Sequence, residues 1–245
     1  MQKKILLIGA SSNLGKEVLK YKRNVAKILS PSSKELNILK PNTIDSYIKR
    51  HKPNYILHLA GLSDPMHQHE IKINESIKKN IIGTANLCLF SNKYQIKLIY
   101  ISTNFVYPGD KGNFSEEHPL LPFNNYGWSK LGGECSVMMT KKSLVLRLCI
   151  AKIPYKHKIA FTNYITSFLS DKKVANIILK LIDQKGVINV GGKTRSAYDF
   201  ATSENCNVNG KKLKIRNKLK IGKNTSINVN KLKKLLKIKN EKNFS

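Results

Sequence analysis

The stretch "NNYGWSKLGGE" places a phenol and an ammonium group where they could do acid–base chemistry together. Tyr126 precedes Lys130 by four residues, in a segment that reads as the first turns of a helix. Residues four apart lie on one helical face, so the cation can lower the pKa of the phenol. The spacing therefore indicates a tuned proton donor, provided that the rest of the chain supplies a substrate and a cofactor.

A glycine-containing turn, "GASSNLG", follows the first predicted strand. Gly9, Ser12 and Gly15 stand at the three positions of a G-x-x-G-x-x-G loop. A helix that begins here would point free backbone N–H groups and a partial positive charge at a pyrophosphate. Serine at the second position is a departure, since glycine there lets a ligand approach the backbone. Such turns also serve packing alone, but the place of this one at the opening of a βαβ unit favours dinucleotide binding.

The elements that must position these groups alternate along the chain. The apolar runs "KKILLIG", "NVAKIL", "PNYILHLAG", "IKLIYIST" and "SLVLRLCI" predict strands, and helices are predicted at 13–22, 43–52, 75–92 and from about 126. Repeated βα units predict an α/β fold with a Rossmann-type doubly wound parallel sheet, whose ligands lie at the carboxyl ends of the strands.

The end of the second strand bears on the choice of dinucleotide. NAD-preferring folds often carry an acid there, which binds the ribose 2′-hydroxyl. Here the sequence is "LSPSSKE", and Ser32, Ser33 and Lys34 could receive a 2′-phosphate instead. We therefore expect NADP(H), with NAD(H) as the alternative.

Length and cysteine usage narrow the class of protein. The 245 residues, 41% of them hydrophobic, suffice for one α/β domain with a small appendage. Apolar runs fall short of the ~20 residues of a membrane helix, so no membrane partner is expected. Cys88, Cys135, Cys149 and Cys206 form no CxxC pair, which argues against a zinc site and fits free thiols in a reducing cytoplasm. No protein metal site is predicted.

A formal net charge of +29 raises nucleic acid as a partner. Only five of the 44 basic residues are arginine, the residue favoured for bidentate phosphate and base contacts, and the lysines run along the whole chain. Positive charge concentrates only at 211–242. In its second part, 230–242, a basic amphipathic helix is predicted by the helical spacing of Leu232, Leu235, Leu236 and Ile238. Since Phe244 is the one aromatic residue near it, no stacking platform is visible and nucleic-acid binding is disfavoured.

Taken together, these segments resemble one family. "GASSNLG", "KPNYILHLAG", "KKNIIGTANL", "YISTNFVYPGDKGNFSEEHPLLPFNNYGWSKLGGE", "LVLRL" and "GVINVGG" occur in the order found in extended short-chain dehydrogenases/reductases. More narrowly, they are similar to the dTDP-4-dehydrorhamnose reductase family. The resemblance covers residues 1–150 well and the rest thinly.

The resemblance implies a role for each matching residue. Thr103 takes the position of the catalytic hydroxyl, Tyr126 that of the general acid, and Lys130 that of the lysine that lowers the tyrosine pKa and holds the nicotinamide ribose. Reducing a ketone requires a proton on oxygen as well as a hydride on carbon, which agrees with these roles. Thr103 and Asn104 would contact the substrate. The cofactor would be held by Gly9, Ser12, Asn13, Leu14, Gly15, Ser30, Asn37, Ile38, Ala60, Gly61, Leu62, Ile101, Tyr126 and Lys130.

The implied reaction is NAD(P)H-dependent reduction of a nucleotide-linked 4-keto-6-deoxysugar, in the biosynthesis of deoxysugars and cell-surface polysaccharides. An epimerase or epimerase-reductase is the alternative, and it would need a further acid/base. A non-catalytic regulatory subunit is a third reading, because the family includes a nucleotide-binding partner of methionine adenosyltransferase. Retention of Thr103, Tyr126 and Lys130 argues against this third reading.

The second half departs from the family pattern. Asn104 stands where aspartate is usual, Ile150 stands near the place of a tryptophan, and the stretch after the fifth strand lacks the usual Asp-Gln and Pro-Thr pairs. We expect a dinucleotide-binding domain over 1–150 and, over 151–245, a reduced substrate lobe with a basic C-terminal segment. A second subunit could complete so small a lobe, as in a homodimer. Lys156, His157, Lys158 and Arg195 are candidates to meet a substrate diphosphate.

Overall fold

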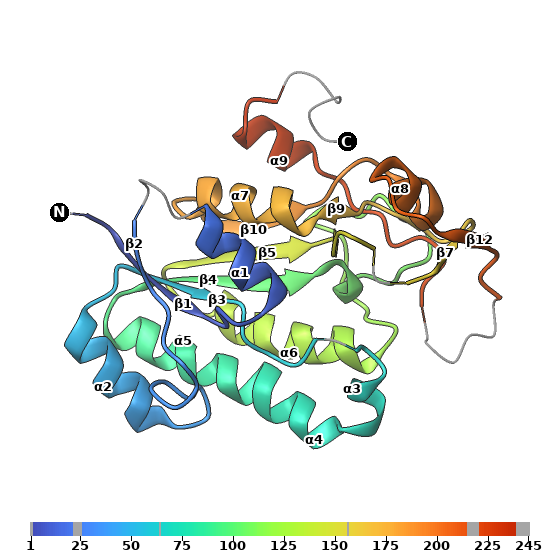
Figure 1. Ribbon diagram of the computed structural model, residues 1–245. Helices are drawn as coiled ribbons and strands as arrows, with labels where there is room; N and C mark the ends of the chain where they lie inside the picture. Colours follow the sequence, from blue (N-terminus) through green and yellow to red (C-terminus); the bar gives the residue numbers. More distant parts are fainter. Residues whose placement is uncertain (1, 22–25, 64, 156, 215–220, 239–245) are drawn as a thin grey trace.

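Six parallel strands form the central sheet of the computed structural model, in the order β2-β1-β3-β4-β5-β10 (Figure 1). The structure describes residues 2–21, 26–63, 65–155, 157–214 and 221–238. The sheet strands are β1 (Lys4–Ile8), β2 (Lys27–Leu29), β3 (Tyr55–His58), β4 (Lys97–Thr103), β5 (Ser143–Leu148) and β10 (Gly186–Val190). Residues 24 and 25 of the predicted second strand lie outside the described residues.

The strand order reverses between β1 and β3. The chain places β2 on one side of β1 and then builds β3, β4, β5 and β10 outward on the other side. Ligands of such sheets bind at this switch point, beyond the carboxyl ends of the strands. The fold class predicted from the sequence is confirmed.

Helices cover both faces of the sheet (Figure 1). One face carries α1 (Asn13–Lys20), α7 (Asp171–Leu181) and α9 (Asn230–Leu235). The other carries α2 (Pro41–His51), α5 (Gly83–Lys93) and α6 (Asn125–Met138). Helix α5 continues from three short elements, α3 (Gln68–Ile71), α4 (Ile73–Ser76) and the π-helical η1 (Ile77–Ile82). The helix predicted over 75–92 therefore exists, but it contains a π-helical turn.

Burial on both faces explains the strand sequences. Residues Ile5 to Ile8 of β1, all of β3 and Leu144 to Leu148 of β5 are buried, as the near-continuous apolar runs of a covered parallel sheet require. Helix starts carry local signals as well. Ser12 caps α1 by accepting a hydrogen bond from the Gly15 N–H, and Pro41 opens α2, where a missing N–H costs nothing.

A smaller lobe lies beyond the carboxyl ends of the strands (Figure 1). It consists of short paired strands and α8 (Ala197–Ser203). The pairs are β6 (Ile150–Ala151) with β9 (Leu169–Ser170), β7 (Ile159–Phe161) with β12 (Asn209–Lys211), and β8 (Ile165–Thr166) with β11 (Arg195–Ser196). A 3-10 turn, η2 (Asn104–Val106), follows β4.

A C-terminal strap, residues 224–229, crosses between this lobe and the loop after β4. Its backbone bridges to Phe114 and Ile165, and Thr225, Ser226 and Ile227 are buried. The basic helix predicted over 230–242 is shorter than expected, since α9 ends at Leu235. Leu232 packs in the core and Leu235 is exposed. Residues 239–242 of that prediction lie outside the described residues.

The sheet does not stop at residue 150, where we expected the first domain to end. β10 pairs with β5, and α7 packs against α1, so residues 171–190 join the sheet and its helical layer. The lobe is therefore drawn from 150–170 and from residues after 190. The division of the chain into a dinucleotide-binding domain over 1–150 and a substrate lobe over 151–245 stays a prediction.

Candidate active site

The glycine turn after β1 approaches the loop after β3 at the switch point. Gly9 has a φ of +97°, and a Cβ there would lie 2.6 Å from the backbone nitrogen of Ala60. Ser12 uses its hydroxyl for the turn itself, donating to the Gly9 carbonyl at 2.7 Å while capping α1. Asn13 is exposed and Leu14 is half-buried. Because α1 begins at Asn13, directly after the turn, its first free backbone N–H groups border the sheet edge.

The loop after β3 is held by a residue that the sequence reasoning did not single out. Asn80, in η1, accepts a hydrogen bond from the Leu62 N–H at 2.7 Å and donates to the Leu62 carbonyl at 2.9 Å. Its amide also donates to the Ser129 hydroxyl at 2.8 Å. Asn80 thus joins the Ala60–Leu62 loop to α6. The π-helical turn that carries it is a common feature of functional sites.

Tyr126 and Lys130 lie in the first turns of α6, as predicted. Asn124 caps the helix by accepting from the Gly127 N–H at 2.8 Å, and Glu70 accepts from the Asn125 N–H at 3.0 Å. The Tyr126 ring packs edge-on against His69, with ring centres 5.0 Å apart. The helix start and the phenol are therefore fixed by groups from α3.

Lys130 is 8% exposed, and its amine lies 4.2 Å from the centre of the Tyr100 ring. Burial lowers the pKa of Lys130 to about 7, and the negative charge of Glu134 partly opposes that shift. Burial likewise lowers the pKa of His58 to about 3, so His58 is neutral at physiological pH. Lys130 is therefore poised to change its charge near neutrality.

Thr103 ends β4 and Asn104 begins η2 at the same sheet edge, and both are buried. The Thr103 hydroxyl accepts from the Phe105 N–H at 3.3 Å and lies 3.4 Å from the Asn104 side-chain oxygen. The Asn104 amide donates to the Thr225 carbonyl at 2.9 Å. Asn104 therefore ties the end of β4 to the C-terminal strap, and its role toward a substrate stays a prediction.

A buried ion pair lies behind these residues. Arg147 of β5 donates to Glu134 of α6 through Nε at 3.0 Å and Nη2 at 2.6 Å, and Ser102 donates to the same carboxylate at 2.6 Å. Arg147 also donates to the Tyr107 hydroxyl at 2.8 Å. The network connects β4, β5, α6 and the loop after β4. It therefore fixes the position of α6 relative to the end of β4, where Thr103 lies.

The loop after β2 carries a carboxylate, Glu35, next to the residues that we expected to receive the 2′-phosphate of NADP(H). Glu35 accepts from the Ser32 N–H at 2.8 Å and from the Ser32 hydroxyl at 2.9 Å, and these bonds lower its pKa. The Ser32 donors expected to meet a 2′-phosphate are thus already bonded to an ionised group. Ser30 is exposed, and the Asn37 side chain accepts from the Leu39 N–H at 2.9 Å while Ile38 packs against Gly83.

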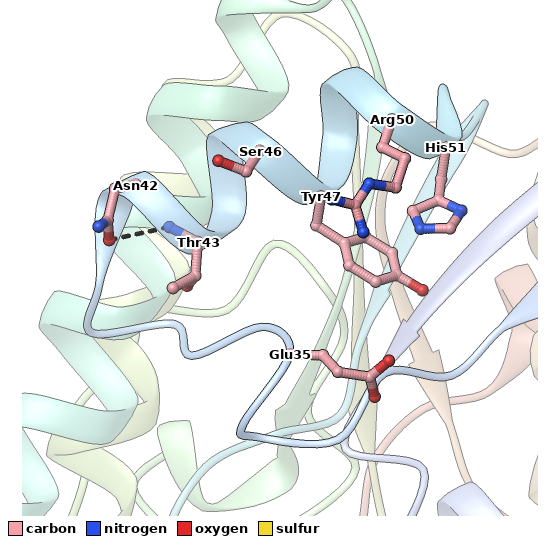
Figure 2. Close-up of a pocket in the computed structure, with 7 residues that line it drawn as sticks. All are labelled: Glu35, Asn42, Thr43, Ser46, Tyr47, Arg50 and His51. Carbon is pink, nitrogen blue, oxygen red and sulfur yellow. Dashed lines mark hydrogen bonds between the residues drawn. The ribbon is translucent and has the colours of Figure 1, made fainter.

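An open pocket on α2 lies apart from the elements that carry Tyr126, Lys130 and Thr103. Glu35 faces Tyr47, Arg50 and His51 across it, and the Tyr47 and His51 rings stack with centres 4.2 Å apart (Figure 2). Its side chains are mostly exposed, and none of them except Glu35 enters the predicted chemistry.

The structure gathers most of the predicted residues from four segments at one sheet edge: the turn 9–15, the loop 60–62, the end of β4 with Asn104, and the start of α6. Ser30, Asn37 and Ile38 lie outside these segments, between β2 and α2. Asn80, Tyr100 and Glu35 were missed by sequence reasoning. Asn80 lies in the quoted motif "KKNIIGTANL", which could have marked it. Lys156, proposed for the substrate diphosphate, lies outside the described residues. No cluster of ligating side chains able to hold a metal ion, and no helix long and apolar enough to span a membrane, occurs in the described ranges.

Comparison with known proteins gives a family match over most of the chain. The family described as RmlD substrate binding domain matches residues 3–201. GDP-L-colitose synthase of Yersinia pseudotuberculosis is 37% identical over 123 residues, covering 48% of this chain and 39% of the relative. dTDP-4-dehydrorhamnose reductase of Aggregatibacter actinomycetemcomitans is 26% identical over 197 residues, covering 79% and 63%. The chain thus spans between about two fifths and two thirds of the length of these curated relatives.

A solved structure shows the same fold. dTDP-4-dehydrorhamnose reductase of Bacillus anthracis in complex with NADP superposes with a TM-score of 0.82 at 22% identity, covering 95% of this chain and 91% of the other. The arrangement of sheet, helices and lobe is therefore shared along almost the whole chain.

Proposed function

Because the chain belongs to the RmlD substrate binding domain family, we propose that it reduces the keto group of a nucleotide-linked 4-keto-6-deoxysugar with NAD(P)H. The observation that carries this proposal is the placement of Tyr126 and Lys130 at the start of α6, at the sheet edge where Thr103 and the glycine turn also end. Such reductions belong to the biosynthesis of deoxysugars and cell-surface polysaccharides.

The residues at the switch point fit a dinucleotide. At Gly9 the backbone is so close to Ala60 that no side chain could be added, which leaves the turn open to a pyrophosphate. Gly15 packs against the same turn. Ser12 caps α1, and the first backbone N–H groups of this helix lie at the same edge of the sheet. When bound, the dinucleotide supplies the hydride. Gly9, Ser12, Asn13, Leu14 and Gly15 would hold its phosphates, and Lys130 its nicotinamide ribose.

Three side chains would take part in the protonation of the substrate carbonyl oxygen. Tyr126 donates its phenolic proton as negative charge develops on that oxygen, and the Lys130 cation four residues away stabilises the resulting phenolate. Thr103 donates a hydrogen bond to the same oxygen and orients it. His69 and Phe105 hold the Tyr126 ring from two sides, with ring centres 5.0 and 5.9 Å away.

Arg195 supports the assignment of a diphosphate to the lobe. Its guanidinium lies 5.1 Å from the Phe200 ring centre, and its buried Nε has no hydrogen-bond partner among the described residues. A half-buried arginine with an unused donor suits an anionic substrate group. His157 and Lys158 lie on the same lobe near β7.

The direct test is consumption of NADPH with a panel of nucleotide-linked 4-keto-6-deoxysugars. We expect turnover with at least one sugar, and a loss of about 100- to 10,000-fold in Tyr126→Phe, because this variant lacks only the proton donor. NADPH binding by Tyr126→Phe should stay near the wild-type value, whereas Lys130→Ala should weaken both binding and turnover. Equal turnover by wild type and Tyr126→Phe would exclude the tyrosine as the acid.

We infer a preference for NADP(H), which the NADP complex of the Bacillus anthracis reductase supports and the negative charge of Glu35 opposes. If Glu35 repels a 2′-phosphate, then Glu35→Gln should raise the affinity for NADPH and leave that for NADH nearly unchanged. Fluorescence titration with both reduced cofactors measures this ratio. An unchanged ratio would place the adenosine ribose away from this loop.

We also propose a homodimer through the outer faces of α5 and α6, two helices that pack side by side. Leu89 on α5 is 67% exposed, and Trp128 and Met138 on α6 are 49% and 54% exposed. Exposed apolar side chains that gather on one face are typical of a protein–protein interface. Leu89→Glu should shift sedimentation toward the monomer, whereas Leu121→Glu, at an exposed loop, should not. Sedimentation of wild type as a monomer would exclude this assembly.

The four free cysteines are in keeping with a reducing cytoplasmic setting.

A further inference from the structure

Lys130 rests on the face of an aromatic ring. Its amine lies 4.2 Å from the ring centre of Tyr100, a fully buried residue of β4. Over the described part of the chain, no carboxylate forms an ion pair with Lys130. The ring face, which carries the negative end of the aromatic quadrupole, is therefore its contact for positive charge.

Tyr100 is held rigidly in this position. Its hydroxyl donates to the backbone carbonyl of Lys130 at 3.1 Å, so one side chain contacts both ends of the lysine. A Cβ on Gly133 would lie 2.7 Å from that hydroxyl, so the glycine leaves room for it. The His58 ring lies 5.5 Å from the Tyr100 ring on another side.

The other ionisable groups around Lys130 provide little compensation for a buried cation. From β3 and α3, His58 and His69 face it, and burial lowers the pKa of both, so they are neutral near pH 7. From α6, Tyr126 precedes Lys130 by one helical turn, and Glu134 is already paired with Arg147 at 2.6 Å. The charge of Glu134 still favours the ammonium form in part. The face of the Tyr100 ring is a second local source of stabilisation.

We propose that Tyr100 is a positioning residue of the active site, whose ring face holds the Lys130 amine in place and favours its charged form. The inference rests on the proposed function only for the use that Lys130 makes of its charge. The ring stabilises the cation without accepting a proton, so the ammonium N–H groups that point away from the ring stay available for the ribose and for the phenol.

The test is the pKa of the Lys130 amine, measured by NMR on protein with 13C-labelled lysine and without any ligand. Lys130→Met identifies the resonance. We expect wild type and Tyr100→Phe to titrate alike, near pH 7, since both keep the ring. Tyr100→Leu should lower the pKa by about one unit, because leucine lacks the ring face that favours the ammonium form.

A matched control is Phe90→Leu, which removes a half-buried ring 5.6 Å from Lys93 and should leave the Lys130 titration unchanged. If Tyr100→Leu does not fold, fluorinated phenylalanines at position 100 keep the shape of the ring and withdraw its negative charge stepwise. The Lys130 pKa should then fall as fluorine is added. An unchanged pKa in Tyr100→Leu or across the fluorinated series would overturn the proposal. Failure to bind NADPH would instead count against the proposed function and leave this titration valid.

Discussion

At the scale of single residues, Lys130 combines a charge with burial. Burial lowers its pKa to about 7 from 10.5, and Glu134 opposes the shift only in part. Protonation of Lys130 is therefore unfavourable in the folded protein, and contacts of the ammonium group with a ribose and a phenol would offset this cost. Residues with such perturbed pKa values cluster at functional sites.

This pKa predicts how stability changes with pH. Between pH 7 and 10.5 the unfolded chain binds more protons at Lys130 than the folded chain does, so the free energy of unfolding should rise with pH in this window. The penalty is complete below pH 7. Relative to Lys130→Met, wild type should gain about 2–3 kcal/mol between pH 7 and 9.

Urea denaturation of both proteins at the two pH values measures this gain, and the variant controls for the many other lysines. Parallel changes in the two free energies of unfolding would mean that the buried amine keeps an ordinary pKa.

At the scale of elements, the close approach of α6 to η1 depends on two adjacent glycines that are not equivalent. A Cβ at Gly133 would lie 2.5 Å from the backbone oxygen of Asn80. A Cβ at Gly132 would meet only the flexible end of Ile81, at 2.7 Å. The sequence pair "GG" therefore contains one position that packing requires to be glycine and one where a methyl group can be accommodated.

We expect Gly133→Ala to destabilise the fold by about 1–3 kcal/mol, because η1 or Tyr100 must shift. Gly132→Ala should be neutral or slightly stabilising, since alanine is the better helix former by about 0.5–1 kcal/mol. Thermal or urea unfolding of the two variants provides a matched comparison. Equal losses in both would contradict the distinction.

At the scale of the whole molecule, the Arg147 network connects the sheet to the lobe. Beyond its bonds to Glu134 and Tyr107, Arg147 donates to the Glu116 carbonyl at 3.0 Å. Tyr107 in turn donates to the Asn189 side chain at 2.9 Å, and Asn189 donates to the strap at the Asn228 carbonyl. One buried arginine thus supports parts of the chain that are far apart in sequence.

Arg147→Met should therefore destabilise the protein by about 3–5 kcal/mol, because it leaves the Glu134 carboxylate buried without its cation. Lys3→Met removes an exposed ion pair with Asp183 and should leave the urea midpoint nearly unchanged. Similar midpoints for the two variants would show that the buried pair contributes no more than an exposed one.

The net charge of +29 gives a prediction for substrate binding. If exposed lysines at the lobe hold a diphosphate, the Michaelis constant of the best nucleotide sugar should rise with salt, since exposed charges are screened beyond ~8–10 Å at physiological ionic strength. An uncharged keto-sugar serves as the control. A constant that stays flat with salt, or equal use of the free sugar, would remove the diphosphate from the proposed interaction.

The sequence by itself determined the order of βα elements, the turn at Gly9 and the pairing of Tyr126 with Lys130. These are local properties: apolar runs, small residues after a strand, and a spacing of four on a helix are visible in short windows. The family resemblance extended them to Thr103. The carboxyl ends of β1, β3 and β4 then had to meet at one edge because a parallel sheet allows no other arrangement.

Only the tertiary structure decided what surrounds these groups. Asn104 meets the strap 121 residues away, Arg147 reaches Tyr107 across 40 residues, and Tyr100 meets Lys130 across 30. No local pattern encodes such contacts, because each depends on how strands and helices from separate segments pack. The same holds for the pairing of the sixth strand, β10, with β5. The bonds between Glu35 and Ser32, by contrast, join residues three apart and are local. The pKa of Lys130 belongs to this second group, since burial by distant residues, more than its own sequence neighbours, sets the cost of its charge.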